Sequence, residues 1–502
     1  MLEKITVFIE KHNDIFLFGT GKWSLPLKKT LENKGIRIHG MLVSHKCVGE
    51  DYFDGTPVYA LDEMCENFGN PGIILAVHSK YHAAIMDLLG KRGLSNYLCC
   101  EDDFLRNCFR EFNRLTKEKM APYMGWKSKM SHNITSWNKV LIIRLDGIGD
   151  AVLMTPFLRE FRRNHPESDV TLLTSRTTYN LFEECPYINR VFSIDTRKTS
   201  NGYIDDQLKK ALLYMEKNFK KEHFDVSLVP RWDTDNYGAS FLSFFSESDC
   251  KIAYSENSTR DKKIQNENYD KLFSYVITDN IIRHEIEKNM FFLKSIGCEI
   301  LNDCLELWDN RADMQFVYDL LYRFGFNRNK ETIAIGLSAS NGSKMWEISN
   351  YFELMERISK VYPDRFQFVL LGGDDASKGA SFMKESASTK NVINLVGALS
   401  LRQNFSLLKQ SFLYVGNDTG LIHIAVAAQI RVLEVSSFPR DGDAYYGFST
   451  VRFHPWKVHY YIAQPRTGRE GCKGWCRKTY AHCINDVTVN DVFQGFVQLL
   501  SK

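Results

Sequence analysis

Short apolar runs alternate with longer amphipathic stretches along the chain, and each apolar run ends at small or polar residues. Near the N-terminus, apolar runs predict strands at residues 15–18, 36–43 and 72–77, and an amphipathic stretch predicts a helix over residues 80–92. This alternation is typical of a parallel sheet with helices on its faces. Residues 1–105 are therefore expected to form a small Rossmann-like α/β module, with nucleotide binding and a purely structural or docking role as its alternatives.

The same alternation resumes at residue 139, after a charged and irregular stretch that predicts a linker over residues 106–137. It indicates two further Rossmann-like halves, expected at residues 138–315 and 316–502. Their strands are predicted at 139–144, 170–174, 191–194, 226–229, 332–337, 366–373 and 412–417, with helices at 151–164 and 286–296. Two such halves in series place a ligand crevice between them.

Composition narrows the class of protein without naming a function. The 502 residues carry a formal net charge of only +3, which argues against a general nucleic-acid binder. Charges interrupt the N-terminal apolar residues, so a secretory signal is not expected, and no apolar run is long enough for a transmembrane helix. Most of the 12 cysteines are scattered, which favours a reducing cytosol. We expect a cytoplasmic protein that acts peripherally at a membrane surface.

The segment from Asp418 to His423 follows a buried strand and begins a predicted helix. Asp418 or Thr419 can cap this helix, whose N-terminal amides and dipole attract phosphate. Gly420 would let a ligand approach the backbone, and His423 lies one turn further on. The alternative interpretation is an ordinary helix cap beside a packed histidine.

Two other strand ends carry residues suited to the same ligand. After residues 332–337 come Ser338, Ser340 and Lys344, of which the lysine can neutralise a diphosphate. The alternative is a polar loop with a solvated lysine. After residues 139–144 comes Asp150, a carboxylate at a helix start that could act as a general base or simply as a cap.

Polar residues also follow the strand at 226–229, and they hint at the binding of a sugar acceptor: Arg231, Trp232, Asp233 and Asp235. In the first module, the Gly19-Thr20-Gly21 turn is a weak dinucleotide fingerprint because the third glycine of the usual motif is missing.

Three cysteines lie close together near the C-terminus: Cys472, Cys476 and Cys483. Thiolates at this spacing suit zinc or iron in a structural site, with His482 or His454 as a fourth ligand. Buried free thiols that fix a loop are the alternative.

Taken together and in this order, Asp150, Lys344-Met345-Trp346, Gly372-Gly373 and Asp418-Thr419-Gly420 with His423 resemble the heptosyltransferase family, glycosyltransferase family 9. The resemblance covers about residues 138–500. It implies a GT-B fold whose N-terminal half binds the acceptor and whose C-terminal half binds a nucleotide-sugar donor. It also implies inverting chemistry that needs no cofactor or divalent metal.

The resemblance assigns a role to each residue. Asp150 would deprotonate the acceptor hydroxyl, and Lys344 would stabilise the departing diphosphate together with the amides of Thr419 and Gly420 and with His423. Asp418 would belong to the same donor-binding site. Ser338 or Ser340 would hydrogen-bond the phosphates, and Asp374 or Asp375 would bind the ribose. Glu347 follows Trp346 where the family commonly has proline, and this departure concerns the donor more than the reaction.

The expected reaction transfers heptose from ADP-heptose to a bacterial surface glycan such as lipopolysaccharide, at the inner membrane. The partners are thus a nucleotide-diphosphate sugar and a glycan or glycolipid, without nucleic acid. Alternatives are another nucleotide sugar, a protein acceptor, a nicotinamide-dependent oxidoreductase that uses the N-terminal turn, or an inactive nucleotide-binding assembly protein.

Overall fold

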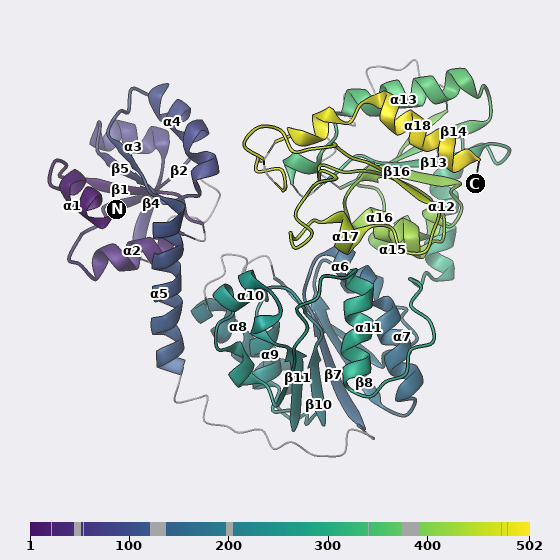
Figure 1. The fold of residues 1–502 in the computed structure, drawn as a ribbon, viewed down its shortest axis with the longest axis horizontal. Helices are drawn as coiled ribbons and strands as arrows, with labels where there is room; N and C mark the ends of the chain where they lie inside the picture. Colours follow the sequence, from purple (N-terminus) through teal and green to yellow (C-terminus); the bar gives the residue numbers. More distant parts are fainter. Residues whose placement is uncertain are drawn as a thin grey trace.

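The computed structural model folds into three α/β lobes, each built on its own sheet (Figure 1). It describes residues 1–21, 23–44, 52–53, 55–120, 137–196, 204–339, 341–373, 391–472, 474–478 and 480–501.

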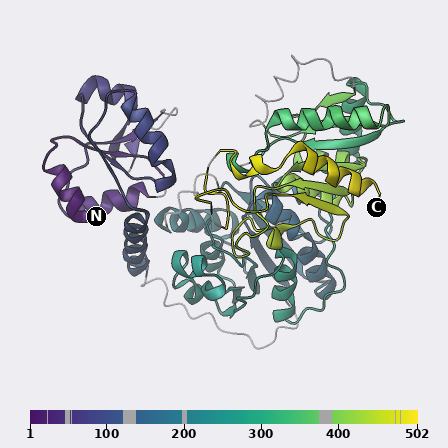
Figure 2. The same cartoon turned by 45° about the horizontal axis from the view of Figure 1, so that its top comes forward.

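The first lobe is a small Rossmann-like module with the strand order β3-β4-β2-β1-β5-β6. All its pairings are parallel except the β3–β4 hairpin at the edge. Its strands are β1 (Ile15–Phe18), β2 (Gly40–Val43), β3 (Tyr52–Phe53), β4 (Thr56–Ala60), β5 (Gly72–Leu75) and β6 (Tyr97–Cys99). Its helices are α1 (Leu2–Ile9), α2 (Ser24–Glu32), α3 (Leu61–Phe68), η1 (Ser79–Tyr81), α4 (His82–Gly90) and α5 (Asp102–Met120). Figures 1 and 2 both show the sheet of this module apart from the other two lobes, while α5 extends from it toward the second lobe.

The second lobe has a fully parallel sheet in the order β12-β11-β10-β7-β8-β9. Its strands are β7 (Lys139–Arg144), β8 (Asp169–Ser175), β9 (Arg190–Ile194), β10 (Val226–Val229), β11 (Cys250–Tyr254) and β12 (Tyr275–Ile277). Its helices are α6 (Ile148–Leu153), α7 (Thr155–Asn164), η3 (Tyr179–Leu181), α8 (Ile204–Phe219), α9 (Ala239–Phe245), η5 (Glu256–Ser258), α10 (Arg260–Gln265), η6 (Tyr269–Leu272) and α11 (Glu285–Ser295).

The third lobe repeats this topology with the order β15-β14-β13-β16-β17-β18, again fully parallel. Its strands are β13 (Glu331–Gly336), β14 (Phe366–Leu371), β15 (Val392–Asn394), β16 (Leu413–Asn417), β17 (Arg431–Val435) and β18 (Tyr460–Ala463). Its helices are α12 (Arg311–Arg323), η7 (Gly342–Lys344), α13 (Ile348–Val361), α15 (Leu401–Leu408), α16 (Gly420–Ala427), α17 (Thr450–Phe453), η9 (Cys483–Asp486) and α18 (Val489–Leu500).

In each of the two larger sheets the chain starts in the middle, builds outward to one edge, and returns to the middle to build the other edge. The strand order reverses between β7 and β10 in one sheet and between β13 and β16 in the other. Ligands of doubly wound sheets bind at such reversal points, beside the carboxyl ends of the strands. The predicted architecture, two Rossmann-like halves preceded by a small Rossmann-like module, is confirmed.

Some element boundaries differ from the prediction. The helix expected over residues 151–164 is two helices, α6 and α7, which meet at Met154 just before Pro156. Proline removes a backbone donor and fixes φ, so it fits the first turn of a new helix better than the interior of a long one. Leu105 and Cys108 on α5 are buried in the core of the first module, so its packing continues beyond residue 105. Helix α12 runs through residue 315, the expected limit between the two halves.

The two larger lobes meet through helices α6 and α16, whose N-terminal turns are in direct contact (Figure 1). A Cβ atom added to Gly420 would lie 2.5 Å from Cγ2 of Ile148 and 3.2 Å from the amide nitrogen of Gly149. A Cβ atom added to Gly149 would lie 2.8 Å from Cδ2 of His423. Glycine at both positions is thus what lets the helices approach. One hydrophobic cluster includes residues of both lobes, among them Val152 and Ile422.

No helix in the described ranges combines the length and the apolar character that a membrane crossing requires.

The contact between α6 and α16 predicts the effect of a single methyl group. Gly420→Ala should lower the thermal midpoint because the new Cβ atom must push Ile148 and the α6 backbone away, at a cost of about 1–3 kcal/mol. Differential scanning fluorimetry measures the change. Gly90→Ala is the control, since a Cβ atom there meets nothing within 4 Å. Equal midpoints for the two variants would contradict the tight contact.

Candidate functional site

The site begins at the strand reversal of the second lobe, where β7 and β10 end side by side. Arg144 is the last residue of β7, and its buried guanidinium donates to the carbonyl of Pro230 just after β10. The same guanidinium has Nε 2.7 Å from Oδ2 of Asp146. Arg231 approaches Asp146 from the other side, with Nε 3.3 Å from Oδ1. Two arginines and a buried carboxylate therefore lock the two strand ends together.

Asp150 lies in the first turn of α6, within this cluster, and is partly exposed. Its Oδ1 accepts hydrogen bonds from NH1 of Arg231 at 3.0 Å and from NH2 of Arg144 at 3.3 Å. Both contacts go to the same oxygen, and no described side chain donates to Oδ2. Asp150 is thus fixed in orientation through Oδ1, while Oδ2 has no donor among the described side chains.

The strand reversal of the third lobe holds the second part of the site. Lys344 ends the short helix η7 after β13, and Asp418 follows β16. The ammonium of Lys344 donates to Oδ2 of Asp418 at 2.7 Å, and both side chains are largely buried. The Phe448 ring covers the same ammonium, with 3.6 Å from Nζ to the ring centroid. Lys344 is therefore held at the carboxyl edge of the sheet by an ion pair and a cation–π contact.

His423 joins the two parts. It lies in the first half of α16, is only 3% exposed, and packs over Gly149 of α6. Burial lowers the pKa of His423 to about 4, although the carboxylates of Asp418 and Asp150 act in the opposite direction. The imidazole is thus neutral near pH 7. Its Nδ1 is buried and has no hydrogen-bond partner among the described residues.

The structure therefore brings together four of the predicted site residues. Asp150 comes from the second lobe, and Lys344, Asp418 and His423 come from the third. Asp418, Asp150 and Lys344 are all close enough to His423 to influence its pKa. The four side chains meet where the N-termini of α6 and α16 touch, which is where two helix dipoles present their positive ends.

The other predicted residues either lie beside these four or fall outside the described residues. Thr419 is the N-cap residue of α16, but its side chain makes no capping hydrogen bond. Gly420 faces Ile148 of the opposite lobe. The hydroxyl of Ser338 accepts a hydrogen bond from the Gly373 amide at 3.3 Å, which ties two strand ends together. Ser340, Asp374 and Asp375 lie outside the described residues.

Glu434 is a buried carboxylic acid beside this site that the sequence did not point out. It lies within β17, and burial raises its pKa well above the ordinary value, with a further contribution from Asp418. Its Oε2 is buried without a hydrogen-bond partner in the described part of the chain. The raised pKa of Glu434 disfavours a second negative charge next to Asp418.

A buried ion-pair network also connects the two lobes. Arg452 of α17 has NH2 2.8 Å from Oε1 of Glu285 and NH1 2.8 Å from Oδ2 of Asp233. Burial alone would raise the pKa of Glu285, but Arg452 and Lys288 hold it below its ordinary value. The Nζ of Lys288 lies 3.3 Å from the ring centroid of buried Trp232.

The loop after β10, expected to bind an acceptor, has mainly structural contacts. Asp235 accepts the backbone amides of residues 237–240 and so forms the N-terminus of α9. Arg231 is the exception because it contacts Asp150.

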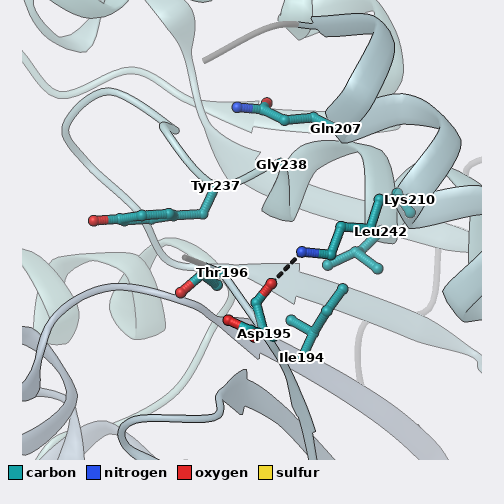
Figure 3. A pocket seen from close by; sticks show the side chains of 9 residues that line it. Ile194, Asp195, Thr196, Gln207, Lys210, Tyr237, Gly238 and Leu242 are labelled. Carbon is teal, nitrogen blue, oxygen red and sulfur yellow. Dashed lines mark hydrogen bonds between the residues drawn. The ribbon is translucent and has the colours of Figure 1, made fainter. Parts of the chain in front are cut away.

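A small pocket lies next to this loop, at the end of β9 and between α8 and α9 (Figure 3). Figure 3 shows Tyr237 on one side of it and Lys210, whose ammonium donates to the carbonyl of Asp195, on the other. Burial raises the pKa of Tyr237, and Asp146 and Asp150 contribute to the same direction. Tyr237 therefore lines the pocket and is close enough to Asp146 and Asp150 to be influenced by their charge.

The C-terminal cysteines gather as predicted. Cys472, Cys476 and Cys483 surround His482, and one potential ligand atom from each lies within 4.8 Å of the others. Of the two histidines named as a fourth ligand from the sequence, His482 therefore lies in the cluster. His454 packs instead against His284 and Trp456.

Comparisons of the sequence with known proteins point to one family of glycosyltransferases. Residues 279–435 match the family model of glycosyltransferase family 9 (heptosyltransferase). Lipopolysaccharide heptosyltransferase 3 of Escherichia coli K12 is 20% identical over 298 residues, which are 57% of this chain and 79% of the relative.

Solved structures extend the likeness to the fold of both large lobes. A family 9 glycosyltransferase from Veillonella parvula superposes with a TM-score of 0.59 at 14% identity, over 74% of this chain and 99% of that one. ADP-heptose lipopolysaccharide heptosyltransferase II of E. coli gives 0.52 at 15% identity, over 72% and 98%. The E. coli heptosyltransferase WaaC, solved with ADP, gives 0.51 at 14% identity, over 72% and 98%.

Two Rossmann-like halves whose strand reversals face each other form a GT-B fold. The family match and the heptosyltransferase relatives support a glycosyltransferase. Among known families the chain resembles glycosyltransferase family 9, the heptosyltransferases, and it carries an additional Rossmann-like module at its N-terminus. The oxidoreductase alternative finds no support in these relatives.

The sequence prediction missed Arg144, Asp146, Glu434 and Phe448. Two of them carried a usable pattern, because a charged residue within or at the end of an otherwise apolar strand is expensive to bury unless it is paired or neutral. Arg144 in Val-Leu-Ile-Ile-Arg and Glu434 in Val-Leu-Glu-Val are such cases. Phe448 approaches Lys344 only through tertiary folding and left no local pattern.

The protonated state of Glu434 predicts a pH effect on stability. Between its ordinary pKa of 4.5 and its raised pKa in the folded protein, the acid is ionised in the unfolded chain but protonated in the folded one. Its contribution to the stability of the fold is therefore complete at low pH and is lost as the pH rises. Glu434→Gln removes this dependence, so the thermal midpoint of the variant should rise relative to that of the wild type as the pH is raised above about 5.

Thermal unfolding at a series of pH values tests this expectation, with exposed Glu353→Gln as the control. A constant difference between wild type and Glu434→Gln at all pH values would show that the acid is ionised in the folded protein.

Proposed function

We propose that the protein is an inverting glycosyltransferase that needs no divalent metal for the transfer step. It would move a sugar, heptose in the first instance, from a nucleotide diphosphate such as ADP to a hydroxyl of a bacterial surface glycan such as lipopolysaccharide. The observation that carries this proposal is the meeting of Asp150 with the Lys344, Asp418 and His423 cluster across the α6–α16 contact.

Asp150 is suited to be the base. Its Oδ1 is occupied by Arg231 and Arg144, so Oδ2 can accept the proton of an acceptor hydroxyl without loss of orientation. The deprotonated oxygen attacks the anomeric carbon from the side opposite the diphosphate, and the bond from that carbon to the diphosphate oxygen breaks with its electron pair. Attack from the opposite side inverts the configuration at that carbon.

The departing diphosphate needs positive charge, and three groups of the third lobe can supply it. Lys344 keeps donor capacity beyond its bond to Asp418, because an ammonium has three N–H groups. The first amides of α16 point out of its N-terminus. His423 is neutral and can donate a hydrogen bond from one ring nitrogen. Together they supply the stabilisation that a metal ion gives in other transferases.

The remaining assignments rest on the relatives and on position. ADP as the nucleotide follows the E. coli relatives, one of which was solved with it. Thr419, Gly420, Ser338 and Ser340 would contact the phosphates, and Asp374 or Asp375 the ribose. The acceptor would bind on the second lobe, beside Tyr237 and the pocket of Figure 3. Contact with the inner membrane belongs to the same proposal because a glycolipid acceptor is anchored there.

Asp150→Asn tests the base. The amide keeps a hydrogen-bonding group for Arg231 but cannot take a proton, so kcat for transfer from ADP-heptose should fall by about 10²–10⁴-fold. The dissociation constant for ADP should change little. Transfer is measured by mass spectrometry of a truncated lipopolysaccharide acceptor. Asp261→Asn, at an exposed position in the same lobe, is the control. Full transfer activity in Asp150→Asn would refute the assignment.

Lys344→Met tests the diphosphate contact. Loss of the ammonium leaves the Asp418 carboxylate unpaired beside the phosphates, so ADP affinity should fall by about 10–100-fold, the usual worth of a charged hydrogen bond. Isothermal titration calorimetry measures it, with exposed Lys360→Met as the control. Added Mg²⁺ should not change the affinity of the wild type. A requirement for Mg²⁺ would contradict metal-independent leaving-group stabilisation.

A further inference from the structure

The four ligand atoms near the C-terminus have the spacing of a tetrahedral metal site. Nδ1 of His482 lies 3.6 Å from Sγ of Cys472, 3.9 Å from Sγ of Cys476 and 3.4 Å from Sγ of Cys483. Zinc bonds of about 2.3 Å to sulfur and about 2.0 Å to nitrogen give a nitrogen–sulfur edge of about 3.5 Å in a tetrahedron. The three observed nitrogen–sulfur separations scatter around this edge, and all four ligand atoms lie within 4.8 Å of one another, which suits one ion between them.

The backbone conformation around Cys472 is compatible with such a site. Gly471 and Gly474 both adopt positive φ, at 78° and 79°, which turns the chain sharply on either side of the cysteine. The amide of Arg477 points at Sγ of Cys472, 3.4 Å away. An N–H group directed at sulfur stabilises the thiolate form, which is the form that binds metal. At Gly468 a Cβ atom would lie 1.9 Å from the carbonyl oxygen of Cys472, so only glycine allows this loop to close.

We propose that Cys472, Cys476, His482 and Cys483 bind one zinc ion, and that this ion fixes the loop that supports Lys344. Three thiolates and one imidazole form a closed set that leaves no open position, as in structural zinc sites. The ion is thus distinct from the metal-independent transfer step and acts on it only through packing.

One path from the cluster to the site runs along aromatic rings. The carbonyl of Gly474 accepts the Asp443 amide at 3.0 Å, which joins the cysteine loop to the loop at residues 438–449. Next to it, Trp475 stacks on Tyr446 with centroids 4.4 Å apart and planes at 12°.

Tyr446 in turn meets the edge of Phe448, with centroids 5.5 Å apart. Phe448 is the ring that covers the ammonium of Lys344. Two aromatic side chains, Tyr446 and Phe448, therefore connect Trp475 to the lysine that would hold the diphosphate.

A second path leaves the cluster at Cys483. This cysteine begins η9, which contacts η7, the short helix that ends at Lys344. Just beyond η9, the carbonyl of Val487 accepts the indole N–H of buried Trp346 at 2.8 Å. The Lys344 loop is thus supported on both flanks by segments that the four ligands hold together.

Metal content tests the first half of the proposal. Protein purified from zinc-containing medium should hold one zinc ion per chain by inductively coupled plasma mass spectrometry. Cys476→Ser and His482→Ala should lose it, whereas Cys304→Ser and His459→Ala, outside the cluster, should keep it.

If the ligand variants fail to fold, thiol modification of the wild type in the presence of a chromogenic chelator should release the same single equivalent. Folded wild-type protein without zinc, or with zinc that survives these ligand changes, would overturn the site. One equivalent of iron in place of zinc would overturn the choice of ion.

Hydrogen exchange and ADP binding test the second half. Zinc-depleted protein should exchange faster at Tyr446 and Ser449, whose amides donate within the 438–449 loop, while β7 and β8 stay protected. Its ADP affinity should fall by about 3–10-fold, less than in Lys344→Met because the lysine remains. Unchanged exchange in this loop would refute the coupling.

The coupling rests on the proposed function, but different experimental results would contradict the proposed function and the zinc proposal. If the proposed function is wrong, zinc content and loop exchange still respond as stated while ADP binding is absent from the wild type. If the zinc proposal is wrong, ADP binds and Lys344→Met weakens it, but the cysteine variants leave it unchanged.

Discussion

The site depends on one steric fact, the close approach of the N-termini of α6 and α16. Each helix follows the central strand at a strand reversal of its own sheet, and the two meet across the boundary between the lobes. Gly149 and Gly420 stand at the contact, and each occupies a space that a side chain would need. A larger residue at either position would separate Asp150 from the Lys344 and Asp418 pair, even though both sheets would still fold.

Charge explains why this contact suits a diphosphate. Two helix N-termini concentrate partial positive charge, and Lys344 adds a full one. The carboxylates do not cancel this effect, because Asp150 is paired with arginine, Asp418 is paired with lysine, and burial raises the pKa of Glu434 and so favours its neutral form. In the proposed reaction, a diphosphate would meet donors whose positions are already fixed, so little reorganisation would be needed as charge develops on it.

The sequence predicted the architecture well because strand, turn and helix repeat with regular apolar periods. Every strand predicted in the two large halves is present, and Asp150, Lys344, Asp418 and His423 converge as expected. Local pattern could not reveal the partners of these residues. Arg231 reaches Asp150 from 81 positions away, and Phe448 reaches Lys344 from across a loop. The break between α6 and α7 was missed because amphipathic periodicity continues through it, although Pro156 marks it.

His423 shows how the two lobes can meet without burying an unpaired charge. Each lobe balances its own ionised groups before the interface forms: Asp150 with the arginines of the second lobe, Lys344 with Asp418 of the third. The side chain that crosses the boundary is an imidazole that burial keeps neutral. A charged group there would require a partner from the opposite lobe and would disturb one of these pairs. A neutral ring with a free nitrogen instead completes the contact and still offers a hydrogen bond to a ligand that reaches it.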